Sequence, residues 1–214
     1  TETGALERML AAAIYREKGF SYTQALEWLQ QIPVSQKEKL LNCLLQTPDN
    51  HTIPARELEF AFFTFDLLID QGAYFEIKRH RMMTQTPQSL TASLGYAVPR
   101  VIADAGVIAP YLAAMENARS AYNQLARFNP AVASYVVPNG YNRRVLLNLN
   151  LRSLVHFIRL RSAPNAHFSV RRAAQRMAED VSKRFPELAT LLGRNENETS
   201  SAIESSCFSS TRVM

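Results

Sequence analysis

Glycine is scarce in this chain: only 7 of its 214 residues are glycine. The two glycine-rich phosphate loops, GxGxxG and GxxxxGK followed by Ser or Thr, are both absent, so a nucleotide site would have to use side-chain cations instead. Charged residues make up 20% of the chain and hydrophobic residues 47%, which is enough to bury a core. We therefore expect one folded domain rather than a disordered chain.

Long apolar runs and cysteines are missing as well. No apolar stretch approaches the roughly 20 residues of a membrane span, and the start of the chain lacks the basic and apolar regions of a signal peptide. Two cysteines, Cys43 and Cys207, cannot form a disulfide framework or a zinc site. We expect Cys43 to be a packed core thiol, Cys207 to be exposed and the protein to be cytoplasmic.

What the sequence has in excess is arginine in its second half. Between Arg143 and Arg184 there are ten basic residues and two acids, so this segment has a net charge of +8 while the whole chain has +5. Such a field attracts anions. A solvated helical face would have the same composition, so charge alone does not identify a site. A nucleic-acid module is disfavoured because no DNA- or RNA-binding motif is recognisable.

Hydrophobic periodicity and turn residues predict an α/β chain. The expected strands are residues 60–69, 135–137 and 143–150. The expected helices are residues 5–17, one that begins after residues 21–23, and then 35–46, 71–80, 109–128, 151–162, 165–185 and 186–192. Residues 84–97 are expected to be irregular. The folded domain is expected to span residues 1–193, followed by a disordered Ser-rich tail at 194–214.

Arginine and histidine cluster in two segments that suit a phosphate-bearing ligand. Arg79, His80 and Arg81 follow an expected helix, and two guanidinium groups that flank a histidine suit a phosphate or pyrophosphate. On a second expected helix, Arg152 and His156 share one face. A surface basic triplet and an exposed arginine face are the alternative interpretations. The histidines show no ligand spacing with carboxylates, so no metal site is expected.

Taken together, these motifs resemble the flavin-dependent thymidylate synthases. Arg-His-Arg follows a strand–helix unit and is itself followed, about 70 residues later, by Asn-x-Arg-Ser-Leu-x-x-Phe-x-x-Leu-Arg. Residues 63–65 are similar to the Phe-Thr-Phe strand of that family, with Glu59 at its upstream Glu. Residues 137–138, Val-Pro, stand where the family has Leu-Pro. The likeness covers roughly residues 6–192.

The resemblance implies an α/β fold of the α+β kind, in which helices flank a central mixed or antiparallel sheet. It implies a tetramer with FAD bound between subunits; a tandem pair of domains is the alternative form of self-association. The implied reaction is the reductive methylation of deoxyuridylate (dUMP) to thymidylate (dTMP), in which methylenetetrahydrofolate gives the carbon and NADPH the hydride. No cysteine nucleophile is needed, which agrees with the lack of a reactive cysteine.

Individual residues carry over where they match the family's motifs. The implied flavin-binding residues are Arg79, His80, Arg81, Asn150, Arg152 and His156. Two residues are implied to be catalytic. Arg161 matches the arginine that contacts the uracil, and Ser89 matches a serine in the loop after Arg-His-Arg.

The sequence departs from the family's pattern on the nucleotide side. Pro87, Thr91 and Ser134 stand where the family has Glu, Arg and Arg, and Glu76 replaces a Gln. The two lost arginines hold the nucleotide phosphate in the family, and each such contact is worth roughly 1.5–3 kcal/mol. Two hypotheses follow. The chain is an active thymidylate synthase whose missing cations come from other arginines or a partner domain, or it is a catalytically impaired half of a tandem protein that binds flavin or another ligand or has a structural role.

Overall fold

The computed structural model describes residues 4–46 and 53–213 of the chain. Its helices are α1 (Ala5–Lys18), α2 (Tyr22–Gln31), α3 (Val34–Leu45), α4 (Gln71–Ile77), α5 (Arg100–Asp104), α6 (Ile108–Phe128), α7 (Pro130–Ala133), α8 (Leu151–Arg161), α9 (Phe168–Arg184), α10 (Ala189–Leu192) and α11 (Ser200–Cys207). Its strands are β1 (Phe62–Asp70), β2 (Thr84–Pro87), β3 (Tyr96–Pro99), β4 (Asn142–Asn150) and β5 (Phe208–Val213). Its 3-10 helices are η1 (Arg56–Phe60), η2 (Ser134–Val136) and η3 (Pro186–Leu188).

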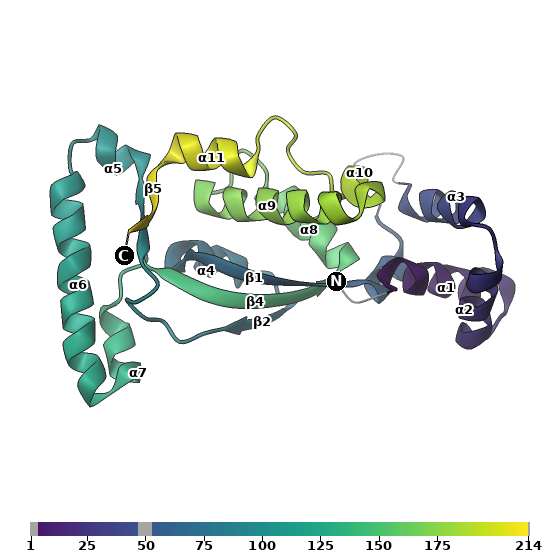
Figure 1. The fold of residues 1–214 in the computed structure, drawn as a ribbon, viewed down its shortest axis with the longest axis horizontal. Helices are drawn as coiled ribbons and strands as arrows, with labels where there is room; N and C mark the ends of the chain where they lie inside the picture. Colours follow the sequence, from purple (N-terminus) through teal and green to yellow (C-terminus); the bar gives the residue numbers. More distant parts are fainter. Residues whose placement is uncertain (1–3, 47–52, 214) are drawn as a thin grey trace.

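A sheet in the order β1-β4-β2 lies at the centre of the molecule, and both of its pairings are antiparallel (Figure 1). β4 pairs with β1 along all nine residues of that strand. Side chains alternate between the two faces of a strand, and Val145, Leu147 and Leu149 of β4 are buried in one core with residues of α8 and α9. The predicted fold class, an antiparallel sheet flanked by helices, is confirmed.

Helices α1, α2 and α3 extend this core at one end of the sheet (Figure 1). Met9 of α1 is completely buried. α2 begins with a capping box, in which the Ser21 hydroxyl accepts from the Gln24 N–H and the Gln24 side chain accepts from the Ser21 N–H. Arg16 donates to Glu57 at 2.6 Å, and this ion pair ties α1 to η1, just before β1.

At the other end of the sheet, β3 and α5–α7 form an arm with a small core of its own (Figure 1). Tyr141 is completely buried and donates its O–H to the backbone carbonyl of Met115 at 2.7 Å. Its ring packs edge-on against Tyr96, with 5.2 Å between ring centroids. Met115 is the buried residue of the 21-residue helix α6, so most of that helix faces solvent.

The C-terminal segment differs from the disordered tail that its composition predicts. Within residues 194–213, Thr199 caps α11, and β5 pairs antiparallel with β3. Ile203 and Phe208 are 0% and 4% exposed, and Phe208 packs edge-on against Phe168 of α9. Burial of Ile203 and Phe208 and the pairing of β5 with β3 therefore offset the entropy cost of ordering this Ser-rich segment. Composition alone does not reveal these contacts.

Three further local predictions are corrected by the structure. Cys43 is exposed rather than packed, because the face of α3 that carries it points to solvent. Residues 135–137 were expected as a strand, but the turn that follows α7 continues as η2, and Tyr135 is 91% exposed. The segment 84–97 contains β2, which pairs with the edge of β4, and the start of β3. Among the described helices, we find none with the length and apolar character needed to cross a membrane.

Candidate functional site

The last turns of α4 and α8 meet in a hydrogen-bonded cluster. Arg161, at the end of α8, donates from Nε to Nε2 of His80 at 2.7 Å. Its terminal nitrogens donate to the Glu76 carboxylate and to the Glu76 backbone carbonyl, both at 3.1 Å. The Arg161 side chain is only 16% exposed. The guanidinium group is therefore held by contacts within the chain.

His80 is held as a neutral ring in this cluster. Burial, followed by the charges of Arg161 and His156, lowers the pKa of His80 from 6.5 to about 4. Because arginine can only donate, Nε2 of His80 accepts and Nδ1 carries the proton. The ring also lies edge-on to Phe157, with 4.9 Å between ring centroids, and 6.2 Å from the His156 ring. His80 thus offers packing and a hydrogen bond at neutral pH, but no positive charge.

The two arginines beside His80 are exposed. The Arg79 side chain is 70% exposed and lies 3.5 Å from the Glu76 carboxylate. Arg81 is also exposed, and it forms no side-chain hydrogen bond or ion pair with the described part of the chain. Both guanidinium groups can therefore reach an anion in solution without first breaking a buried contact.

The start of α8 holds the remaining predicted flavin-binding residues. Asn150 caps the helix, and its side-chain oxygen accepts from the Ser153 N–H at 2.9 Å. Arg152 donates to the Glu59 carboxylate at 2.6 Å and to the Pro54 carbonyl at 3.1 Å. These contacts join α8 to the segment before β1. Asn150 and Arg152 therefore have structural partners of their own in addition to any ligand.

Three of the predicted site residues lie at successive turns along the axis of α8. Arg152 lies in its first turn, the exposed His156 in the middle and Arg161 in the last turn. A rise of 1.5 Å per residue puts Arg152 and Arg161 about 13 Å apart along the axis. His80 lies beside both His156 and Arg161. The structure thus brings His80 of the Arg-His-Arg segment next to the middle and last turn of α8.

Ser89 does not belong to this group. β2 begins close to His80, whose carbonyl accepts from the Gln85 side chain at 2.9 Å, and the strand then leads away along β4. Ser89 is exposed beyond the far end of β2. Its neighbour Gln88 accepts from Arg143 through the backbone carbonyl. One copy of the described chain therefore does not bring Ser89 to Arg161.

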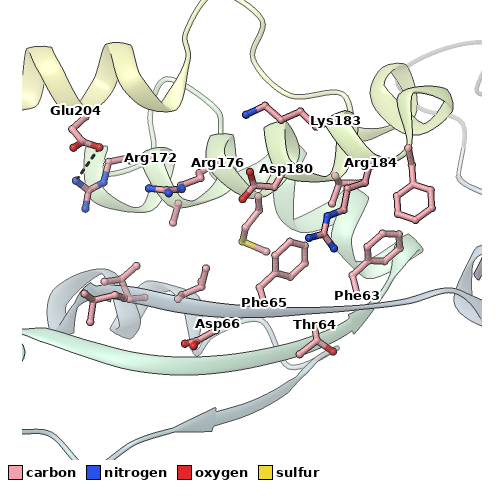
Figure 2. Close-up of a pocket in the computed structure, with 17 residues that line it drawn as sticks. Phe63, Thr64, Phe65, Asp66, Arg172, Arg176, Asp180, Lys183, Arg184 and Glu204 are labelled. Atoms are coloured by element: carbon pink, nitrogen blue, oxygen red, sulfur yellow. Dashed lines mark ion pairs between the residues drawn. The ribbon is translucent and has the colours of Figure 1, made fainter. Parts of the chain in front are cut away.

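A groove that sequence reasoning did not anticipate lies between β1 and α9 (Figure 2). Its volume is about 690 Å³, and Arg172, Arg176, Asp180 and Arg184 of α9 contribute to its wall. The local excess of arginine was the available signal, but no spacing rule said that these side chains would face β1. Among the described residues, no group of three or more His, Cys, Asp or Glu side chains is placed to hold a metal ion.

Comparison with known proteins assigns the chain to a family. A family model described as thymidylate synthase complementing protein matches residues 3–187. The chain belongs to this family. The match includes the central sheet, α8 and α9, while α10, α11 and β5 lie beyond it.

Two kinds of relative in this family resemble the chain. A UPF0159 protein of Chlamydia muridarum is 37% identical over 189 residues, which are 87% of this chain and 36% of that protein. A flavin-dependent thymidylate synthase of Clostridium tetani is 24% identical over 185 residues, covering 76% of this chain and 73% of that protein. One from Geobacter sulfurreducens is 30% identical over 130 residues, 56% of each chain. The chain spans about a third of the length of the UPF0159 relative.

Proposed function

We propose that this chain provides the flavin-binding part of a thymidylate synthase site. FAD would lie on the surface formed by the Arg-His-Arg segment and α8, and the reaction served would be the reductive methylation of dUMP by methylenetetrahydrofolate and NADPH. The observation that carries the proposal is that the exposed Arg79 and Arg81 flank His80 in the chain, and that the His80 ring lies 6.2 Å from the His156 ring on α8.

The residues present fit a flavin dinucleotide. Its pyrophosphate is a dianion, which exposed arginines bind through charge-assisted, bidentate hydrogen bonds. Its planar ring needs an aromatic or apolar surface, and His156 and His80 form one beside Phe157. Arg152, with a side chain 30% exposed, adds a further cation at the start of α8. When bound, the flavin would supply the hydride transfer for which protein side chains have no equivalent.

The chain's own residues would position the flavin and the nucleotide and would neutralise the negative charge of the pyrophosphate. Arg79 and Arg81 place positive charge where the pyrophosphate binds, and Arg152 keeps η1 against α8. His80 stays neutral and holds Arg161 by its Nε2 atom, so the arginine keeps one orientation. A fixed guanidinium is suited to the uracil carbonyl of dUMP, because it donates without reorganisation.

The two positions at which the family has phosphate-binding arginines carry Thr91 and Ser134 in this chain. The side chain of Thr91 bonds to Ser93, and that of Ser134 bonds to the Ala131 carbonyl, so both serve local turns. Neither supplies a cation. We therefore propose that the phosphate contacts come from another copy of the chain or from another domain of a longer protein, in a tetramer or a tandem pair located in the cytoplasm.

A second candidate is a flavin-binding domain without turnover. The observation that favours it is the state of Arg161, whose Nε and both terminal nitrogens already bond to His80 and Glu76. A uracil carbonyl would have to displace one of these contacts. In this version the domain binds flavin and has a structural role in a larger assembly.

Visible absorption of the purified protein and tritium release test these proposals together. A yellow protein that releases tritium from 5-tritiated dUMP, given NADPH and methylenetetrahydrofolate, supports the active enzyme. A yellow protein without release supports the second candidate, and a colourless protein that binds no added FAD overturns both. The variant Arg79→Ala/Arg81→Ala should lower flavin occupancy, while the matched control Lys39→Ala/Arg127→Ala removes two exposed cations elsewhere and should not.

A further inference from the structure

Strand β1 has a free edge. The sheet order places β1 at one side, and its pairing within the described residues is with β4 alone. On the other side, alternate N–H and C=O groups of β1 have no strand partner, and such an edge is a template for another extended chain. Natural proteins usually cover or blunt an edge of this length. The residues around this edge therefore indicate what kind of chain could pair with it.

The groove beside α9 follows this edge (Figure 2). Seven consecutive residues of β1, Phe63–Ile69, line it. Because successive side chains point to opposite faces, a groove lined by all seven runs along the edge of the strand rather than over one face. In Figure 2, Phe63 and Phe65 point toward α9, whereas Thr64 and Asp66 point away from it. The groove thus combines an open backbone with two aromatic side chains.

The opposite wall of the groove is a charged stripe on α9. Arg172, Arg176, Asp180 and Arg184 are spaced four residues apart and all line the groove. A four-residue step on a helix is about 6 Å, and a two-residue step on a strand is about 6.6 Å. Side chains on one face of a strand in the groove would therefore meet this stripe one to one.

Three charges of this stripe have no partner among the described residues. Arg172 lies 3.9 Å from the Glu204 carboxylate and stacks over the Phe208 ring at 4.3 Å. In contrast, Arg176, Asp180 and Arg184 are exposed and form no ion pair or side-chain hydrogen bond there. The open part of the stripe is therefore positive, negative, positive.

We infer that this groove binds an extended peptide segment as an added strand on β1, with acidic, basic and acidic side chains at alternate positions facing α9. Strand addition takes its affinity from main-chain hydrogen bonds and its specificity from alternate side chains. A segment of about seven residues matches the length of the groove. The peptide's first and third charges would pair with Arg176 and Arg184, and its middle charge with Asp180. A nucleic acid strand fits less well, because it would set a phosphate against Asp180 and leave the edge of β1 unpaired.

The inference is tested with two fluorescent heptapeptides of opposite charge order. Thr-Glu-Val-Lys-Val-Glu-Thr should bind saturably in an anisotropy titration, and Thr-Lys-Val-Glu-Val-Lys-Thr should bind roughly tenfold or more weakly, because each exposed pair changes from attraction to repulsion. Amide hydrogen exchange of β1 should slow at alternate residues when the first peptide binds. Equal binding of the two peptides, or none, overturns the inference.

Backbone pairing is tested on the unaltered protein with N-methylated forms of the first peptide. Methyl groups on the even-numbered or on the odd-numbered amides block one edge of the peptide each. Binding should be lost for the set that faces β1 and kept for the other set. If both methylated peptides bind as tightly as the parent peptide, the contact is electrostatic alone and strand addition is wrong.

The charge stripe is tested by reversal. The variant Arg176→Glu/Asp180→Lys/Arg184→Glu should prefer the second peptide, while the control Lys39→Glu/Arg127→Glu, which alters exposed cations on other helices, should keep the original preference. Unchanged preference in the reversed variant contradicts the proposal. The proposal is also contradicted if the unaltered protein and the control variant form a dimer in sedimentation and the reversed variant does not, because a second copy would then occupy the groove.

Discussion

Nε of Arg161 lies 2.7 Å from Nε2 of His80, and this contact fixes the protonation state of the histidine. A guanidinium group cannot accept, so the ring must be neutral for the hydrogen bond to exist. Protonation of His80 would break the bond and set two cations side by side. Burial and the charge of Arg161 accordingly lower the pKa of His80 to about 4.

We expect this contact to make the protein less stable in mild acid. The pKa of His80 is about 4 in the folded chain against 6.5 for an unperturbed histidine, so the unfolded chain binds more protons between these values. The contribution of neutral His80 to the free energy of unfolding is therefore fully present above about pH 6.5 and is lost as the pH falls toward 4. The full shift corresponds to roughly 3 kcal/mol, and solvent screening of this half-buried ring reduces the expected loss to about 1–2 kcal/mol.

Urea unfolding at neutral pH and near pH 4.5 measures this loss. The variant His80→Gln is the matched control, because its amide oxygen can accept from Arg161 without titrating. The free energy of unfolding of the variant should fall less with pH than that of the unaltered protein. Equal falls in both proteins would show that His80 does not contribute to the acid sensitivity.

Glu76 controls how available Arg161 is to a ligand. Its carboxylate lies 3.1 Å from the guanidinium group and also repels any anionic nucleotide. Glu76→Gln keeps a hydrogen-bond acceptor but removes the charge, so the affinity for dUMP should rise by about tenfold. Calorimetry measures it. Glu116→Gln, which alters the Glu116–Arg119 ion pair on α6, should leave the affinity unchanged. Weaker dUMP binding by Glu76→Gln would mean that the carboxylate supports the site.

The two roles of Asn150 can be separated. Its side chain caps α8, so Asn150→Ala should cost about 1 kcal/mol of stability, whereas Asn150→Ser should keep most of the cap. If Asn150 also binds flavin, the Ser variant will unfold like the original protein in urea and yet purify with less flavin. Full flavin content in the Ser variant would assign Asn150 to the helix cap alone.

The regular elements were predictable where a local signal sets both ends. The expected helix 109–128 corresponds to Ile108–Phe128, because Asn129-Pro130 ends one helix and begins the next. The expected strand 143–150 corresponds to β4. α11 and β5 were not predictable, because they are ordered only when Ile203 and Phe208 pack against apolar residues that are far away in the sequence.

The candidate site was predictable in its residue types but not in its contacts. Arg152 and His156 lie on one helix, as their spacing indicates. The contact between His80 and Arg161 joins residues 81 positions apart, and spacing rules say nothing about such pairs. The same holds for Glu76, which sequence comparison shows only as a substitution for Gln. The assignment of these residues to flavin and nucleotide stays a prediction.

Arg100 should help the buried Ile203 and Phe208 to hold the C-terminal segment in place. Its guanidinium group donates to the backbone carbonyls of Ser205, Ser206 and Phe208, at 2.8, 3.0 and 3.2 Å, where α11 ends and would otherwise leave carbonyls without partners. Arg100→Ala should therefore promote local opening of α11 and β5 without global unfolding.

Thiol labelling reports this opening within one molecule. Cys207 is the last residue of α11, while the exposed Cys43 lies on the distant helix α3 and serves as an internal standard. In Arg100→Ala the labelling rate of Cys207 relative to Cys43 should rise by roughly tenfold, which corresponds to about 1.4 kcal/mol of lost local stability. Arg100→Lys keeps the charge but loses the planar fork, so it should give an intermediate rate. A ratio that does not change in Arg100→Ala would mean that the buried Phe208, and not the guanidinium group, holds the segment.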